Sequence, residues 1–87
     1  MYKKEEIEKF IENLDIVQVI GEYVTLKKTG ANYKGFSPFK EERTPSFVVS
    51  PTKNIFKDFS TGIGGNAISF YMKINNITFY EAVEELS

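Results

Sequence analysis

The sequence predicts an α+β domain, in which a small antiparallel sheet is flanked by helices at the N- and C-terminal ends. Three observations predict this fold class. Apolar residues recur at helical spacing near both ends, as at Ile7, Phe10 and Ile11. Between residues 23 and 59, short runs of strand-forming residues alternate with turns. A glycine-rich stretch, residues 62–65, then separates the strands from the last helical segments.

Two helices are expected before the sheet. Residues 4–13 carry the first apolar face. Asp15 is a typical N-cap residue and precedes a second, shorter apolar run. Gly21 is expected to end that second helix, because glycine is the residue most often found just past a helix C-terminus.

The middle of the chain has the composition of a sheet of three to five strands. β-Branched and aromatic residues, which fit a pleated surface, are concentrated there. Turns are expected at 29–32 and 51–54, and a longer loop at 37–44, which Pro38 and Pro45 bracket. The predicted strands are 23–28, 33–36, 46–50 and 55–59.

Two further helices are expected after the sheet, at 66–74 and 78–86. Thr78 and Glu81 have the spacing of a capping box, in which each side chain satisfies a backbone N–H of the other residue. The chain ends directly after this pattern, at Ser87. We therefore expect one domain, residues 1–87, that is the N-terminal piece of a longer protein.

The composition limits how such a small domain is stabilised. Its 87 residues include no cysteine and no histidine, which excludes disulfides and thiolate or imidazole metal sites. Eight Phe and five Tyr are the main source of core packing. No run approaches the roughly 18 apolar residues of a membrane span, and the charged N-terminus lacks the apolar region of a signal peptide. We expect a cytoplasmic protein without a membrane partner.

The charge is distributed unevenly, although the net charge is only −1. The segments 1–24 and 58–87 are both acidic, whereas 25–57 contains seven basic and two acidic residues. A basic centre of this kind indicates a nucleic-acid partner. Lysine is also common on solvated surfaces, so the charge pattern alone leaves both interpretations open.

Four short stretches resemble a known family in their order and spacing. They are Asp-Ile-Val-Gln-Val-Ile (15–20), Ser-Pro-Phe-Lys (37–40), Thr-Pro-Ser-Phe-Val-Val-Ser-Pro (44–51) and Gly-Ile-Gly-Gly-Asn-Ala-Ile-Ser-Phe (62–70). Together they resemble the N-terminal zinc-binding (CHC2-type) domain of bacterial DNA primase, over about residues 5–86. The resemblance implies a sheet of zinc-ribbon type.

The family's zinc motif is Cys-x-x-His, seventeen residues, then Cys-x-x-Cys. On this sequence its ligand positions are Ser37, Lys40, Asp58 and Thr61, with the spacing unchanged. Since none of the four is a zinc ligand of the family type, we expect no zinc and no other cofactor in this segment. We predict a Lys40–Asp58 ion pair with the hydroxyls of Ser37 and Thr61 completing the hydrogen bonds.

Aromatic packing should compensate for the lost metal, and the candidates beside the site are Phe36, Phe39, Phe56 and Phe59. The alternative is that the four positions are ordinary loop residues without mutual contact.

The resemblance implies single-stranded DNA template binding in support of RNA primer initiation, through a basic and aromatic face of the sheet. Cations pair with phosphates on such surfaces, and bases stack on exposed rings. The candidate DNA-binding residues are Lys27, Lys28, Tyr33, Lys34, Arg43, Thr44, Ser46, Lys53, Phe56 and Lys57. Phe47 and Phe56 are more often core residues than stacking platforms in such strands, whereas Tyr33 is the ring expected to be exposed.

The segment has no catalytic groups of its own. By the resemblance, primer synthesis is magnesium-dependent and belongs to a downstream polymerase domain, which is also an expected partner. A replicative helicase would bind other domains of the longer protein, within the bacterial replication machinery at the nucleoid. The rival hypothesis is a protein-interaction module that docks on the polymerase domain or on another replication protein.

Two other patterns favour no function. Residues 62–67 fit the dinucleotide-binding pattern G-x-G-x-x-A, but no βαβ unit surrounds them. The paired carboxylates Glu41–Glu42 and Glu84–Glu85 lack an accompanying base or nucleophile. We interpret both pairs as solvated surface.

Overall fold

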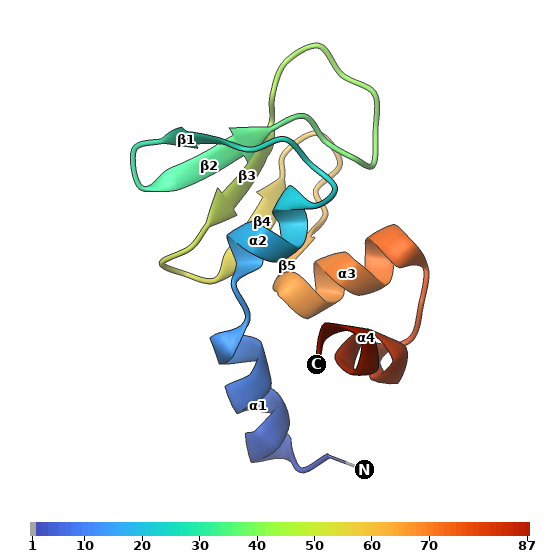
Figure 1. The fold of residues 1–87 in the computed structure, drawn as a ribbon. Coiled ribbons are helices and arrows are strands. Elements are labelled where there is room, and N and C mark those ends of the chain that lie inside the picture. The colour runs from blue at the N-terminus through green and yellow to red at the C-terminus, as the bar shows by residue number, and fades with distance from the viewer. Residues whose placement is uncertain (1) are drawn as a thin grey trace.

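A computed structural model describes residues 2–87; the first residue of the predicted domain lies outside the described part. Figure 1 shows helices at both ends of the chain and a sheet between them, as predicted. The elements are α1 (Lys4–Asn13), α2 (Ile16–Gly21), β1 (Lys27–Thr29), β2 (Asn32–Gly35), β3 (Phe47–Ser50), β4 (Ile55–Asp58), β5 (Gly64–Gly65), α3 (Ala67–Asn75) and α4 (Phe79–Leu86). The predicted α+β class is confirmed.

The five strands form one antiparallel sheet in the order of the sequence, β1-β2-β3-β4-β5. Asn54 lies in the turn between β3 and β4 with a left-handed φ of 58°, a conformation that asparagine tolerates better than most residues. Each strand pairs with the next in an antiparallel register, so no βαβ unit occurs in the described sheet. The glycine-rich segment therefore does not form a dinucleotide-binding fold.

Two expectations about strands differ from the structure. The predicted strand 23–28 is reduced to β1, because Tyr23 and Val24 close the end of α2 through backbone N–H bonds to the Ile20 carbonyl. Val24 then turns into the core. The glycines of β5 pair with β4, although two glycines carry no strand-forming signal.

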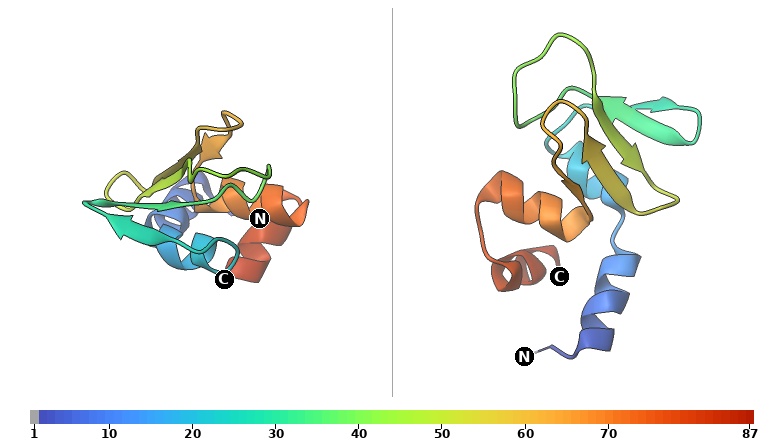
Figure 2. Two further views of the ribbon diagram at one scale, coloured as in Figure 1. Left: turned by 90° about the horizontal axis from the view of Figure 1, so that it is seen from above. Right: turned by 180° about the vertical axis from the view of Figure 1, so that it is seen from behind.

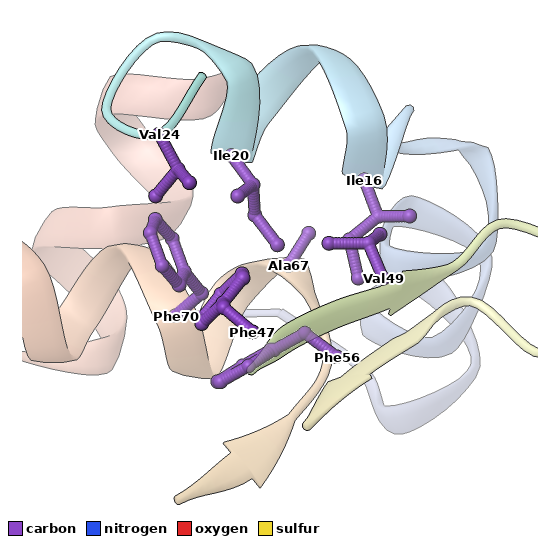
Figure 3. Close-up of a cluster of buried hydrophobic side chains, with 8 residues drawn as sticks. All are labelled: Ile16, Ile20, Val24, Phe47, Val49, Phe56, Ala67 and Phe70. Carbon is purple, nitrogen blue, oxygen red and sulfur yellow. The ribbon is translucent and has the colours of Figure 1, made fainter. Parts of the chain in front are cut away.

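Helices α2 and α3 cover one face of the sheet, and the main core lies between them and the strands. Figure 3 shows this cluster: Ile16 and Ile20 from α2, Ala67 and Phe70 from α3, and Phe47, Val49 and Phe56 from the sheet, together with Val24. The rings of Phe47 and Phe56 are stacked with centroids 5.4 Å apart, and Phe70 meets both edge-on. Burial of this aromatic cluster stabilises the sheet against the two helices.

A second, smaller core joins the two ends of the chain. Ile68 of α3 and Ala82 and Val83 of α4 are buried there, with Phe10 and Ile11 of α1 packed against them. The predicted capping box begins α4, since Thr78 Oγ1 accepts from the Glu81 N–H at 3.2 Å and Glu81 Oε1 accepts from the Thr78 N–H at 2.9 Å. Helices α1 and α4 thus lie farther from the sheet than α2 and α3, on the same side of it. The face of the sheet that points away from the helices is left uncovered (Figure 2).

Candidate functional site

Three of the family's four ligand positions, Ser37, Asp58 and Thr61, meet at one end of the sheet around a buried carboxylate. Asp58, the last residue of β4, is 0% exposed. Its Oδ2 accepts from Ser37 Oγ at 2.5 Å and from Thr61 Oγ1 at 2.8 Å. Its Oδ1 accepts from Ser60 Oγ at 2.7 Å and from the Ser60 N–H at 3.1 Å. The predicted hydroxyl partners Ser37 and Thr61 are confirmed, and Ser60 is a partner that the motif spacing does not indicate.

The predicted Lys40–Asp58 ion pair is wrong. Lys40 is exposed, and within residues 2–87 the carboxylate of Asp58 bonds only to the hydroxyls and the N–H just described. The physical reason is the cost of burying an ammonium, which exceeds what one ion pair returns when neutral donors are already in place. Lys40 stays in water, on the loop that leads from β2 to β3.

Glu42 holds this loop closed, contrary to its interpretation as solvated surface. Its Oε2 accepts from the Ser37 N–H at 2.8 Å and from the Ser46 N–H at 3.3 Å. Its Oε1 accepts from Ser46 Oγ at 2.6 Å. Both ends of the loop are thereby tied to one carboxylate, whereas the neighbouring Glu41 is exposed.

The donor set does not fit zinc. Zinc in structural sites is bound by thiolates and imidazoles, and no described cluster contains three His, Cys, Asp or Glu residues that could hold a metal ion. Ser37 and Thr61 present neutral hydroxyls, and Lys40 offers no lone pair while protonated. Asp58 is the only carboxylate of the set, and its oxygens already accept four hydrogen bonds.

The aromatic residues near this cluster divide into two pairs. Phe56 is buried, and Phe39 packs against Phe47 and Phe70 with centroids 6.4 Å and 5.9 Å apart. Phe36 and Phe59, however, are 54% and 68% exposed. Their expected contribution to core packing is therefore wrong, because each lies one residue away from the inward-facing position of its strand.

The uncovered face of the sheet carries a row of lysines. In antiparallel pairs, directly opposite side chains point to the same face. Lys27 lies opposite Lys34, Lys34 opposite Val48, and Val48 opposite Lys57. Phe47 and Val49, on either side of Val48 in β3, are buried in the core, so this row faces away from the helices. We call this surface, with its neighbouring exposed rings, the open face.

The exposed rings Phe36 and Phe59 lie at one end of the open face. Phe36 follows Lys34 by two residues, and Phe59 follows Lys57 by two, so each continues the outward alternation of its strand. The Phe59 N–H donates to the Ser46 carbonyl at 3.0 Å, which extends the pairing of β3 and β4 to this position. Sequence reasoning assigned both rings to packing; the spacing of two from an exposed lysine was the signal that could have placed them outside.

The remaining predicted DNA-binding residues are spread over other surfaces. The expectation that Tyr33 is the exposed ring is wrong, because it pairs with the buried Val49 in the row that faces the helices and is itself half-buried against the core. Lys28 lies opposite Tyr33 in the same row. Lys53 is in the turn before β4, and Arg43 and Thr44 are exposed on the loop between β2 and β3. Lys28 and Tyr33 therefore belong to the opposite face of the sheet from the lysine row, whereas Arg43 lines a surface pocket together with Phe36 of the open face.

Two residues of the predicted set are not available to a ligand in this structure. Phe56 is 2% exposed and stacked on Phe47, so its faces are covered by the core. The Ser46 hydroxyl donates to Glu42 at 2.6 Å instead of facing free solvent. Phe56 lies on the inner face because it pairs with the buried Val49, whereas Ser46 is engaged by Glu42 at the end of the loop.

The carboxyl network predicts that acid destabilises the fold. Burial raises the pKa of Asp58, but the hydrogen bonds from Ser37, Ser60 and Thr61 outweigh it, and hold this pKa below its usual value. The Ser46 hydroxyl and the Ser37 N–H likewise lower the pKa of Glu42.

The stabilisation that these two carboxylates give the fold is complete above their unfolded-state pKa values of about 4, and it is lost as pH falls through their lower pKa values in the folded protein. Melting temperatures should therefore be flat near neutrality and decline below about pH 4, less steeply in Asp58→Asn; equal slopes for both proteins would contradict this role.

Within residues 2–87, the helices are too short and too polar for any of them to span a membrane.

Comparisons with known proteins agree on one family. The CHC2 zinc finger family matches residues 2–87. A DNA primase of Geobacillus stearothermophilus is 54% identical over 84 residues, which are 97% of this chain and 14% of that protein. A DNA primase of Pseudomonas putida is 51% identical over 93% of this chain and 12% of its own length. The crystal structure of the zinc-binding and RNA polymerase domains of the Aquifex aeolicus primase superimposes with a TM-score of 0.87 at 48% identity, covering 92% of this chain and 20% of that one. The chain thus spans about one seventh of the first of these relatives.

Proposed function

The chain belongs to the CHC2 zinc finger family, which its DNA primase relatives share, and on this premise we propose that it binds single-stranded template DNA on its open face during primer initiation. The observation that carries the proposal is the lysine row Lys27, Lys34 and Lys57, bounded by the exposed rings of Phe36 and Phe59. Lysines neutralise phosphates, and exposed rings accept stacked bases without regard to sequence.

The dimensions of the open face suit a single strand. Lys34 and Lys57 are separated by one intervening strand, which places their backbones roughly 10 Å apart. The exposed rings lie two residues further along, roughly 7 Å from the lysines. A strand whose phosphates follow the lysines can therefore turn its bases toward the rings. Lys57 Nζ donates to the Gly62 carbonyl at 3.0 Å, so its charge is held in place on this face.

The same proposal assigns roles to the other domains of a longer primase and to its partners. Primer synthesis with magnesium belongs to a polymerase domain elsewhere in a longer primase, and this chain contributes template contacts without a catalytic group of its own. The polymerase domain is then a partner, and a replicative helicase is bound by other parts of that protein. The setting is the bacterial cytoplasm, at the replication machinery of the nucleoid.

Fluorescence anisotropy with a single-stranded oligonucleotide at two salt concentrations tests the proposal. If three lysines contact phosphates, raising salt from 50 to 200 mM should weaken binding roughly twenty-fold. The variant Lys27→Glu/Lys34→Glu should bind at least about ten-fold more weakly and with a shallower salt dependence. The matched control Lys4→Glu/Lys9→Glu makes the same change of charge on α1, far from the sheet (Figure 1), and should bind nearly as the parent does. Equal losses in both variants would show that only net charge matters.

The exposure of Phe36 and Phe59 also supports a second candidate, a docking module for the polymerase domain or another replication protein. Large apolar side chains at a surface are typical of protein interfaces as well as of base stacking. This candidate predicts binding to the polymerase domain that Phe36→Ala weakens, together with no measurable binding to the oligonucleotide. The same anisotropy titration therefore separates the two functions.

A further inference from the structure

We propose that this chain folds without zinc because the buried Asp58 carboxylate links the two segments that the metal links in the family motif. Ser37, in the first half of the motif, donates to Asp58 across 21 residues of sequence. Ser60 and Thr61, in the second half, donate to the same group. One side chain thus stands at the centre of a former four-ligand site and connects both halves.

The arrangement around Asp58 is complete as an anion site. An ionised carboxylate has about four lone-pair positions, and here four donors occupy them. Within residues 2–87, every buried side-chain nitrogen and oxygen has a hydrogen-bond partner. No acceptor capacity is left over for a cation, so a metal would have to displace bonds that already exist.

The charge at the centre also matches. A Zn²⁺ ion with three thiolates and one neutral imidazole carries a net charge of −1, since each thiolate contributes −1 and the ion +2. The Asp58 carboxylate carries the same charge. The net charge held at this end of the sheet is therefore −1 in both cases, and it needs no cation from Lys40, which lies in solvent.

The loop between β2 and β3 has its own replacement for the missing cross-link. In the family motif, the second ligand of the first pair stands at position 40 and ties the loop to the metal. Here Glu42 bonds to the Ser37 N–H and to Ser46, which closes the loop on itself at its two ends. The two carboxylates meet at Ser37, whose hydroxyl donates to Asp58 and whose N–H donates to Glu42.

Thermal unfolding and metal titration of the 87-residue chain test this proposal. The chain should bind no stoichiometric zinc in competition with a chromophoric indicator, and its Tm should be the same with and without EDTA. Ser37→Ala and Thr61→Ala should each lower Tm by roughly 4–8 °C, as expected for the loss of one hydrogen bond in a domain of this size. The control Thr52→Ala removes an exposed hydroxyl from the turn before β4 and should leave Tm unchanged.

A restored variant supplies an independent readout. Ser37→Cys/Lys40→His/Asp58→Cys/Thr61→Cys should bind one zinc ion, and its Tm should fall when EDTA is added. Stoichiometric zinc in the unmodified chain, or a Tm that EDTA lowers, would overturn the proposal. The proposal would also be overturned if Ser37→Ala and Thr61→Ala had the same Tm as Thr52→Ala. A restored variant that bound no zinc would overturn it as well, because the scaffold would then not be that of the metal site.

Discussion

Asp58→Asn is expected to lower the free energy of unfolding by about 2–4 kcal/mol, a large part of the 5–15 kcal/mol typical of a domain. The Ser60 N–H cannot reverse its direction, so the amide oxygen must take the place of Oδ1. The amide NH₂ then faces Ser37 Oγ and Thr61 Oγ1, which both donate to Oδ2 in the native protein. These hydroxyls would have to turn away and lose their buried acceptor.

Chemical denaturation at neutral pH measures this effect, and Glu41→Gln is the matched control. Glu41 carries the same charge in the same part of the molecule but is exposed and outside the network. Its neutralisation should change the free energy of unfolding by no more than about 0.5 kcal/mol. If Asp58→Asn and Glu41→Gln had equal small effects, the carboxylate network would not be a source of stability.

The helices were predictable because their signals are local. Asp15 accepts from the Gln18 N–H at 3.1 Å, as an N-cap should, and the Thr78 capping box is formed as predicted. The first strand was predicted too long because Val24 is a strand former by propensity. In the structure its burial between α2 and the sheet decides its conformation. The pairing of Gly64 and Gly65 with β4 depends on the tertiary fold, so composition could not indicate it.

At the candidate site, too, the sequence could predict only what depends on spacing along the chain. The family spacing brought Ser37, Asp58 and Thr61 together correctly, but it could not name Ser60, which is not a ligand position. It also could not choose the partner of Asp58, since that choice depends on the cost of burying Lys40.

Register also decides which rings are exposed. A shift of one residue in a strand moves a side chain to the other face. Phe56 was named both as a DNA-binding candidate and as a core residue, and the pairing of β3 with β4 places it in the core. Phe59 was expected to pack beside the former metal site, but it lies on the exposed face.

The variants Phe47→Ala and Phe59→Ala are expected to show that the two faces of the sheet have different roles, one in stability and the other in DNA binding. Phe47 is 0% exposed and contacts the rings of Phe56 and Phe70 at centroid distances of 5.4 and 5.8 Å. Its truncation should lower the free energy of unfolding by about 3–5 kcal/mol, because it removes buried contacts and leaves a cavity. Phe59 is 68% exposed, so Phe59→Ala should change stability by no more than about 0.5 kcal/mol.

For DNA binding the order of the two variants should be the opposite, with the larger effect in Phe59→Ala. Phe59→Ala should weaken binding of a single-stranded oligonucleotide by about 1–3 kcal/mol if one base stacks on this ring. Phe47→Ala, measured where most of it remains folded, should keep nearly normal affinity, since its ring points toward α2 and α3 (Figure 3). Denaturation curves and anisotropy titrations on the same two proteins give both comparisons. If Phe59→Ala retained full affinity while Lys27→Glu/Lys34→Glu lost it, the open face would bind DNA through its charges alone and its exposed rings would be left for a protein partner.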